Sequence, residues 1–214
     1  MEQATGLREQ KKLRTHHRLA ATALRLFLEH GFDAVSVADI AAAAEVSKPT
    51  LFRYFAGKED LVLHRFADHQ DEAARIVRTR AADQTPVQAL HEHCLLGLRN
   101  RDPITGLNDD PDVVSFQQLL YSTPSLQTRL LHYTEREVDL LAETLRQDAD
   151  GSLVARLAAL HLVTVRHELG RRNWRKIAEG RSADAVYPEA VVDAHRAFGM
   201  LATGMDTLPP RSAP

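Results

Sequence analysis

The chain has 214 residues, of which 44% are hydrophobic and 26% are charged, and its formal net charge is −2 at pH 7. These values are ordinary for a globular protein of one or two domains. No run of 18 apolar residues occurs and the first 30 residues lack the apolar core of a signal peptide, so neither a transmembrane helix nor a membrane partner is expected. A single cysteine, Cys94, excludes an internal disulfide and fits a reducing cytoplasm, which is the expected location.

Charge is unevenly distributed along the chain. Residues 1–25 carry six Lys and Arg but only two Glu, whereas residues 66–214 carry 17 basic and 21 acidic residues. A basic end on an otherwise acidic chain is typical of a segment that contacts nucleic-acid phosphates. The same run also suits the solvated side of an N-terminal helix, so charge alone does not decide between the two.

Alternating β-branched segments are almost absent, and the fold class predicted is all-α, with about nine helices. In the first helix, apolar residues recur at a helical period, and Gly31 is expected to end it. Ser36 and Ser47 are expected N-caps of two short helices, and Asp39 completes a capping box with Ser36. The expected helices lie at about residues 8–30, 36–44, 47–55, 58–81, 86–100, 112–122, 125–148, 153–167 and 188–205.

Residues 36–62, SVADIAAAAEVSKPTLFRYFAGKEDLV, are the most informative segment. They predict two short helices joined by a tight turn and followed by a third helix, an arrangement that suits insertion of the second helix into the DNA major groove. Ala41, Val46 and Leu51 are expected to form the small core between these helices. Polar side chains at the start of the second helix then remain free to face DNA.

The pattern LFLEHGFDAVSVADIAAAAEVSKPTLFRYFAGKEDLV, residues 26–62, resembles the DNA-binding domain of the TetR family of transcriptional regulators. The resemblance is strong over about residues 10–65 and weak beyond them. It implies an N-terminal helix-turn-helix domain (residues 1–57), a helical ligand-binding and dimerisation domain (58–208) and a disordered tail (209–214). It also implies a homodimer that binds a palindromic double-stranded DNA operator and represses transcription until a small-molecule effector releases it.

The resemblance places the recognition helix at residues 47–54. Pro49 or Thr50 is expected beside a thymine methyl group and Arg53 near a guanine, while Lys58 falls at a phosphate-contacting position. The expected DNA-binding residues are Ser36, Ser47, Lys48, Pro49, Thr50, Arg53, Tyr54 and Lys58.

Two positions depart from the family pattern. Glu45 occupies a turn position that is often Gly, so it is expected at positive φ with modest strain. Gly57 stands where a Ser often caps the fourth helix, and a Gly cap is only slightly weaker.

Effector and dimer residues are predicted from residue type and helical position. Aromatic and basic side chains can anchor a ligand in an apolar pocket, although each could equally be a packing residue. The candidates for ligand binding are Phe116, Tyr121, Tyr133, Arg166 and Trp174. The helices at residues 153–167 and 188–205 are rich in small and apolar residues and could form a four-helix interface, or could close only the monomer's own core. The candidates for the dimer interface are Leu153, Leu157, Leu160, Val191, Phe198, Ala202 and Met205.

Two other classes of function are considered. His91 and Cys94 are three residues apart on a helix, which would suit a metal or redox sensor, but no third ligand is evident and no metal or other cofactor is expected. The sequence has no phosphate-binding loop, nucleophile elbow or dinucleotide loop, so an enzyme is not expected. The alternative is a helical enzyme or carrier with a surface that only resembles a helix-turn-helix.

Overall fold

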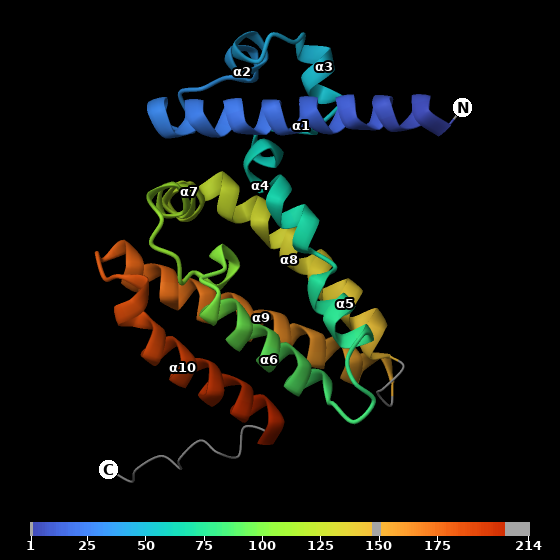
Figure 1. The fold of residues 1–214 in the computed structure, drawn as a ribbon, viewed down its shortest axis with the longest axis vertical. Coiled ribbons are helices and arrows are strands. Elements are labelled where there is room, and N and C mark those ends of the chain that lie inside the picture. The colour runs from blue at the N-terminus through green and yellow to red at the C-terminus, as the bar shows by residue number, and fades with distance from the viewer. Residues whose placement is uncertain (1, 147–150, 204–214) are drawn as a thin grey trace. The chain divides into compact units, whose positions relative to one another are not determined.

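The structure is a computed structural model that describes residues 2–146 and 151–203. These residues form ten α-helices and one 3₁₀-helix and contain no β-strand, which confirms the all-α prediction (Figure 1). Within these ranges, no helix is long and apolar enough to cross a membrane. The helices are α1 (Glu2–His30), α2 (Val37–Ala43), α3 (Lys48–Phe52), α4 (Lys58–His69), α5 (Glu72–Arg78), α6 (Pro86–Arg99), η1 (Pro103–Thr105), α7 (Pro111–Ser122), α8 (Pro124–Leu145), α9 (Ser152–Ala178) and α10 (Ala183–Thr203).

The chain divides into two compact units, each built from two segments. Unit 1 comprises Met1–Asp68 and Ser115–His132, and unit 2 comprises His69–Val114 and Tyr133–Pro214. The expected boundary after residue 57 differs from this division, because α4 and the first part of α8 belong with the N-terminal helices. Ion pairing between an Asp of α4 and an Arg of α8, described below, is one of the contacts that hold them there.

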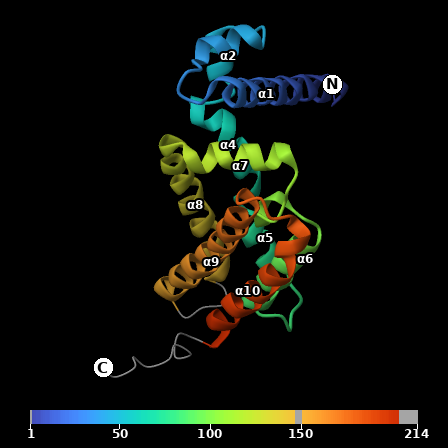
Figure 2. The same cartoon turned by 90° about the vertical axis from the view of Figure 1, so that its left-hand side faces the viewer.

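The core of unit 1 is formed by the predicted apolar face of α1. Leu19, Ala23 and Phe27 are almost completely buried, together with Ile40 of α2 and Leu51 of α3. Figures 1 and 2 show α2 and α4 on opposite sides of α1. α1 ends at His30, as predicted, where the backbone turns into the left-handed region at the following glycine.

In unit 2, α10 packs against both α6 and α9. One apolar cluster draws buried residues from α5, α6, α8, α9 and α10, and a second joins α6, α9 and α10. Gly106 follows η1 at φ +67°, and a Cβ atom on it would lie 1.9 Å from the carbonyl oxygen of Gly170 in α9. The backbone of this turn therefore approaches the backbone of α9 more closely than any side chain would allow.

Several helix boundaries differ from the sequence prediction: α1 begins at Glu2 rather than near residue 8, and α9 continues to Ala178 rather than ending near residue 167. The helix expected over residues 58–81 is interrupted, since α4 ends at His69 and α5 begins at Glu72. The last helix begins at Ala183 rather than near Pro188, which lies inside it. The backbone N–H of Ala183 donates to Oδ2 of Asp109 at 2.8 Å, so the helix start is supported by a residue far away in the sequence.

Lys58, predicted to contact phosphate, is engaged inside unit 1. Its Nζ donates to the carbonyl oxygens of Phe32 at 2.5 Å and Val35 at 2.9 Å. It also lies 4.2 Å from the centre of the Phe32 ring, within cation–π range. The ammonium group therefore ties the connection between α1 and α2 to the start of α4, and its contact with DNA stays a prediction.

Replacing Gly106 with Ala is expected to lower the free energy of unfolding by roughly 3 kcal/mol, because the new Cβ both strains the positive φ and overlaps the carbonyl of Gly170. Gly180→Ala is the matched control, since Gly180 has φ +90° but no atom within 4 Å of the place that a Cβ would take. This control should lose only about 1 kcal/mol. Urea denaturation followed by circular dichroism measures both, and equal losses would contradict the close approach.

Lys58→Met should lower the free energy of unfolding by about 2 kcal/mol, because two carbonyl groups lose a charged donor. Lys48→Met removes an exposed amine and should change it by less than about 0.5 kcal/mol. Denaturation of the two variants side by side tests this difference. An unchanged stability in Lys58→Met would mean that the ammonium group does not hold the connection.

Candidate nucleic-acid interface

Both short helices begin with the predicted caps. Ser36 Oγ accepts the N–H of Asp39 at 3.2 Å, and Oδ2 of Asp39 accepts the N–H of Ser36 at 2.9 Å. Hydrogen bonds from Ser36 hold the pKa of the Asp39 carboxyl below its usual value. Ser47 Oγ accepts the N–H of Thr50 at 3.2 Å. The capping box therefore engages the Ser36 N–H, and the predicted contact of Ser36 with DNA stays a prediction.

The turn between α2 and α3 has the predicted backbone conformation. Glu45 lies at φ 53°, the left-handed region that a non-glycine residue adopts only with modest strain. The N–H of Val46 donates to the carbonyl oxygen of Ala41 at 2.9 Å and closes the turn. The Glu45 side chain is exposed, so the carboxylate stays in solvent. The turn sets α3 at its angle to α2.

The exposed side of α3 and its C-cap consists of Lys48, Pro49, Phe52 and Arg53, which we call the outer face of α3. Their spacing of one, four and five residues places them on one side of a helix, and Leu51 lies on the buried side. No hydrogen bond or ion pair joins the side chain of Lys48 or Arg53 to another described residue. Both cations are therefore available to a partner outside the chain.

The remaining predicted residues of α3 lie beside this face. Thr50 is half-buried, and its Oγ1 lies 2.9 Å from Ser47 Oγ. Tyr54 is also half-buried, with its ring 5.5 Å from the guanidinium carbon of Arg53. Phe52 is missing from the sequence prediction, although its position four residues after Lys48 already indicated it. The structure thus exposes a second apolar residue beside Pro49 on this side of α3.

The five predicted ligand residues do not fall within one unit. Phe116 and Tyr121 belong to unit 1, whereas Tyr133, Arg166 and Trp174 belong to unit 2. Tyr121, Tyr133 and Trp174 are half-buried, which does not distinguish binding from packing. The ring of Phe116 stacks on another phenylalanine of unit 1, with 6.4 Å between their centres. Their joint role as a pocket stays a prediction.

Arg166, predicted as a ligand anchor, is held by two buried carboxylates. Its guanidinium donates to Oε1 of Glu137 at 2.6 Å and to Oε2 of Glu72 at 3.3 Å, and Nε2 of His167 lies 2.9 Å from Oε2 of Glu137. We call these four residues the ion-pair cluster, which joins α5, α8 and α9. Removing the arginine would leave buried carboxylates without compensation, so Arg166 stabilises unit 2, and its predicted role in ligand binding stays a prediction.

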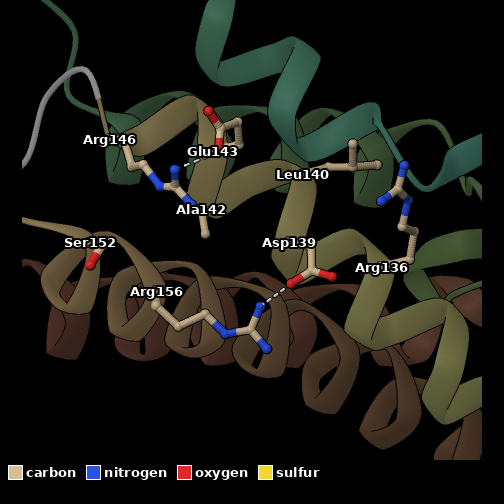
Figure 3. A pocket seen from close by; sticks show the side chains of 8 residues that line it. All are labelled: Arg136, Asp139, Leu140, Ala142, Glu143, Arg146, Ser152 and Arg156. Carbon is tan, nitrogen blue, oxygen red and sulfur yellow. Dashed lines mark hydrogen bonds and ion pairs between the residues drawn. The ribbon is translucent and has the colours of Figure 1, made fainter.

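A pocket of about 320 Å³ lies between the last turns of α8 and the first turns of α9 (Figure 3). Figure 3 shows Arg156 of α9 directed at Asp139 of α8, with which it forms an ion pair. Arg146 pairs with Glu143 at 3.0 Å. The pocket is mainly charged and contains none of the predicted ligand residues. It therefore lends no support to an apolar ligand chamber at this place.

The residues predicted for the dimer interface differ in how exposed their side chains are. Leu153, Leu157 and Leu160 are exposed along one side of α9, and Ala202 is exposed on α10. Phe198 is only 1% exposed and stacks on the ring of His91, with 4.9 Å between their centres. Phe198 therefore belongs to the core of unit 2, which corrects its assignment to an interface. Val191 is half-buried against the second apolar cluster, and Met205 lies outside the described residues.

Cys94 is not set up as a reactive thiol or a metal ligand. It is half-buried against both apolar clusters, and burial raises the pKa of its thiol. Burial and the nearby His195 lower the pKa of His91. Across residues 2–146 and 151–203, no group of three His, Cys, Asp or Glu is arranged to hold a metal ion. These surroundings do not favour the sensor alternative.

The chain is similar to known proteins in the segment that contains α2 and α3 and also outside it. Residues 19–64 match the family model for bacterial regulatory proteins of the tetR family. The HTH-type transcriptional regulator TcmR of Streptomyces glaucescens is 30% identical over 158 residues, which are 72% of this chain and 63% of TcmR. The chain thus matches less than two thirds of this relative. TcmR is named as a regulator, a class distinct from enzymes.

Two solved structures share the fold along almost their whole length. GusR of Salmonella enterica has a TM-score of 0.55 at 20% identity, covering 89% of this chain and 95% of GusR. NalD of Pseudomonas aeruginosa, described as the secondary repressor of the MexAB-OprM multidrug efflux pump, has a TM-score of 0.57 at 17% identity, covering 87% and 97%. The helix-turn-helix geometry, the family match and the relatives agree, and the chain belongs to the TetR family of bacterial regulatory proteins.

Proposed function

We propose that the chain is a cytoplasmic homodimeric repressor that binds a palindromic DNA operator and leaves it when a small-molecule effector binds. The observation that carries the proposal is the outer face of α3, where two cations form no hydrogen bond or ion pair within the described chain. Family membership supports the same reading, and NalD, with a similar fold, is described as a repressor.

The outer face of α3 has the chemistry of a recognition surface. A guanidinium such as that of Arg53 donates two parallel hydrogen bonds to the O6 and N7 atoms of guanine in the major groove. An ammonium such as that of Lys48 neutralises a phosphate and contributes affinity without sequence preference. Arg53 is therefore proposed to specify a base and Lys48 to position the helix on the backbone.

Dimerisation is proposed through the exposed sides of α9 and α10. Leu153, Leu157 and Leu160 follow one another at four- and three-residue spacing, so they form one apolar stripe on α9. Val192 and Ala202 are exposed on α10. A second copy would remove these side chains from water, and its two-fold symmetry would match two operator half-sites.

Coupling between effector and DNA is proposed to run through α8. Its first part belongs to unit 1, where Arg129 donates to Oδ1 of Asp60 in α4 at 3.0 Å. Its second part belongs to unit 2, where Glu137 joins the ion-pair cluster. The helix expected at residues 58–81 is interrupted after His69, whereas α8 continues without a break. An effector that favours one position of α8 would bias the other unit.

Substitutions on the outer face should weaken DNA binding without affecting the fold. A duplex selected by the protein from a random pool serves as the probe, and fluorescence anisotropy gives the dissociation constant. Arg53→Ala should weaken binding roughly ten- to hundred-fold, and Lys48→Met should reduce the salt dependence by about one ion. Arg136→Ala, which removes an exposed arginine in unit 2, is the control. Parent-like affinity in both α3 variants would contradict the proposal.

Leu157→Glu should dissociate the dimer, because it places a charge in the middle of the apolar stripe of α9. Light scattering after size-exclusion chromatography measures the molar mass, which should fall to that of a monomer. The affinity for the operator should fall as well, because a monomer contacts only one half-site. Leu131→Glu is the matched control, because Leu131 of α8 is even more exposed but lies outside the stripe. A monomeric parent protein, or a dimeric Leu157→Glu variant, would argue against this interface.

A further inference from the structure

We infer that the contact of His91 in α6 with His195 and Phe198 in α10 is acid-sensitive, and that α10 loosens from α6 when the His91 ring takes up a proton. The chemistry of this contact depends only on the fold of unit 2. Its consequence rests on the proposed function, because α10 also carries part of the proposed dimer interface. A fall in pH is then a second input, besides the effector, that reduces operator binding.

The contact lies where α6 and α10 pack side by side in unit 2 (Figures 1 and 2). The ring of His91 reaches from α6 to α10 and stacks on the ring of Phe198, with 4.9 Å between the centres and 19° between the planes. The ring of His195 meets it edge-on, also with 4.9 Å between the centres. Because Phe198 is a buried member of the first apolar cluster, His91 takes part in the packing of α10.

A positive charge on His91 has no partner in this packing. Its Nε2 is buried and forms no hydrogen bond with any described residue. A neutral imidazole can keep its proton on Nδ1 and leave Nε2 as a lone pair, whereas an imidazolium carries a proton on both nitrogens. Protonation therefore creates a buried N–H donor without an acceptor, on a ring that has become charged, and both changes cost free energy.

The groups around His91 do not offset this cost. The face of Phe198 attracts a cation, but His195 approaches from α10 and repels one when it is itself protonated. Glu92 of α6 favours the charged form, yet it is exposed and already accepts a hydrogen bond from Nε2 of Gln84 at 2.8 Å. From α5, η1 and α9, which also pack on α6, no charged group of a described residue acts on His91. Burial and then His195 therefore lower the pKa of His91.

The same helix presents part of the proposed dimer interface. Val192 and Ala202 are exposed on α10, and the exposed His195 follows Val192 by three residues, a spacing that makes the two side chains neighbours. When α10 loosens from α6, these side chains lose the fixed position that a second copy needs. Dimers then dissociate, and a monomer contacts only one operator half-site.

Urea denaturation at several pH values tests the chemistry on the full chain without DNA. Because the pKa of His91 is lower in the folded protein, the unfolded state binds more protons, and stability is lost as the pH falls through about 6.5, the value of an unperturbed histidine. Between pH 7.5 and 5.5, the urea midpoint of the parent should fall further than that of His91→Phe, which keeps an aromatic ring but cannot be protonated. An equal fall in both proteins would overturn the inference.

Controls separate His91 from the other histidines. His132→Phe removes an exposed histidine of α8 and should keep the pH dependence of the parent. His93, whose pKa is also lowered by burial, is present in every variant, so its contribution is common to all of them. If His91→Phe does not fold, NMR titration of the parent decides, because the ring of His91 should titrate below pH 6.5. Titration at or above that value contradicts the inference.

Light scattering after size-exclusion chromatography tests the consequence, at a protein concentration near the dissociation constant of the dimer. The parent should be mainly dimeric at pH 7.5 and largely monomeric at pH 5.5, whereas His91→Phe should stay dimeric at both. A parent dimer that persists unchanged at pH 5.5 rules out the acid input. A parent that is monomeric already at pH 7.5 contradicts the proposed dimer, which is a different result, and the urea comparison still decides the role of His91.

Discussion

The ammonium group of Lys58 is the interaction on which the arrangement of unit 1 depends. A lysine in the first turn of a helix is unfavourable for the helix dipole, so its position calls for compensation. The carbonyl oxygens of Phe32 and Val35 and the face of the Phe32 ring supply that compensation. One side chain thereby fixes the approach to α2, the start of α4 and, through α2, the placement of α3.

A second set of charges organises unit 2. Two buried carboxylates, Glu72 and Glu137, share the guanidinium of Arg166, and this buried ion pairing adds to the apolar and polar contacts among α5, α8 and α9. Apolar packing tolerates sliding more readily than a hydrogen-bonded ion pair does. Together with Asp60 and Arg129 in unit 1, this cluster gives α8 a fixed partner in each unit.

Helix caps and turn conformations were predictable from the sequence. Side-chain contacts between residues far apart in the sequence were not. The caps at Ser36 and Ser47 and the positive φ of Glu45 involve residues within a few positions of one another, so a short pattern carries them. Lys58 and Arg166 were assigned to DNA and ligand because their partners lie 23 to 94 residues away. Phe198 was assigned to the dimer interface for a similar reason. An apolar residue on a helix gives the same sequence pattern whether it packs in the core of its own chain or against a second copy.

The side chains on the outer face of α3 make few contacts with the rest of the protein. The side chains of Lys48 and Arg53 form no hydrogen bond or ion pair with other described residues, and Phe52 leaves half its surface in water. Substitution there changes little of the free energy of folding, whereas the core residue Leu51 has no such freedom. Selection can therefore retarget the proposed repressor to a new DNA sequence by single steps at these positions, and the regulated genes can diverge while the scaffold stays the same.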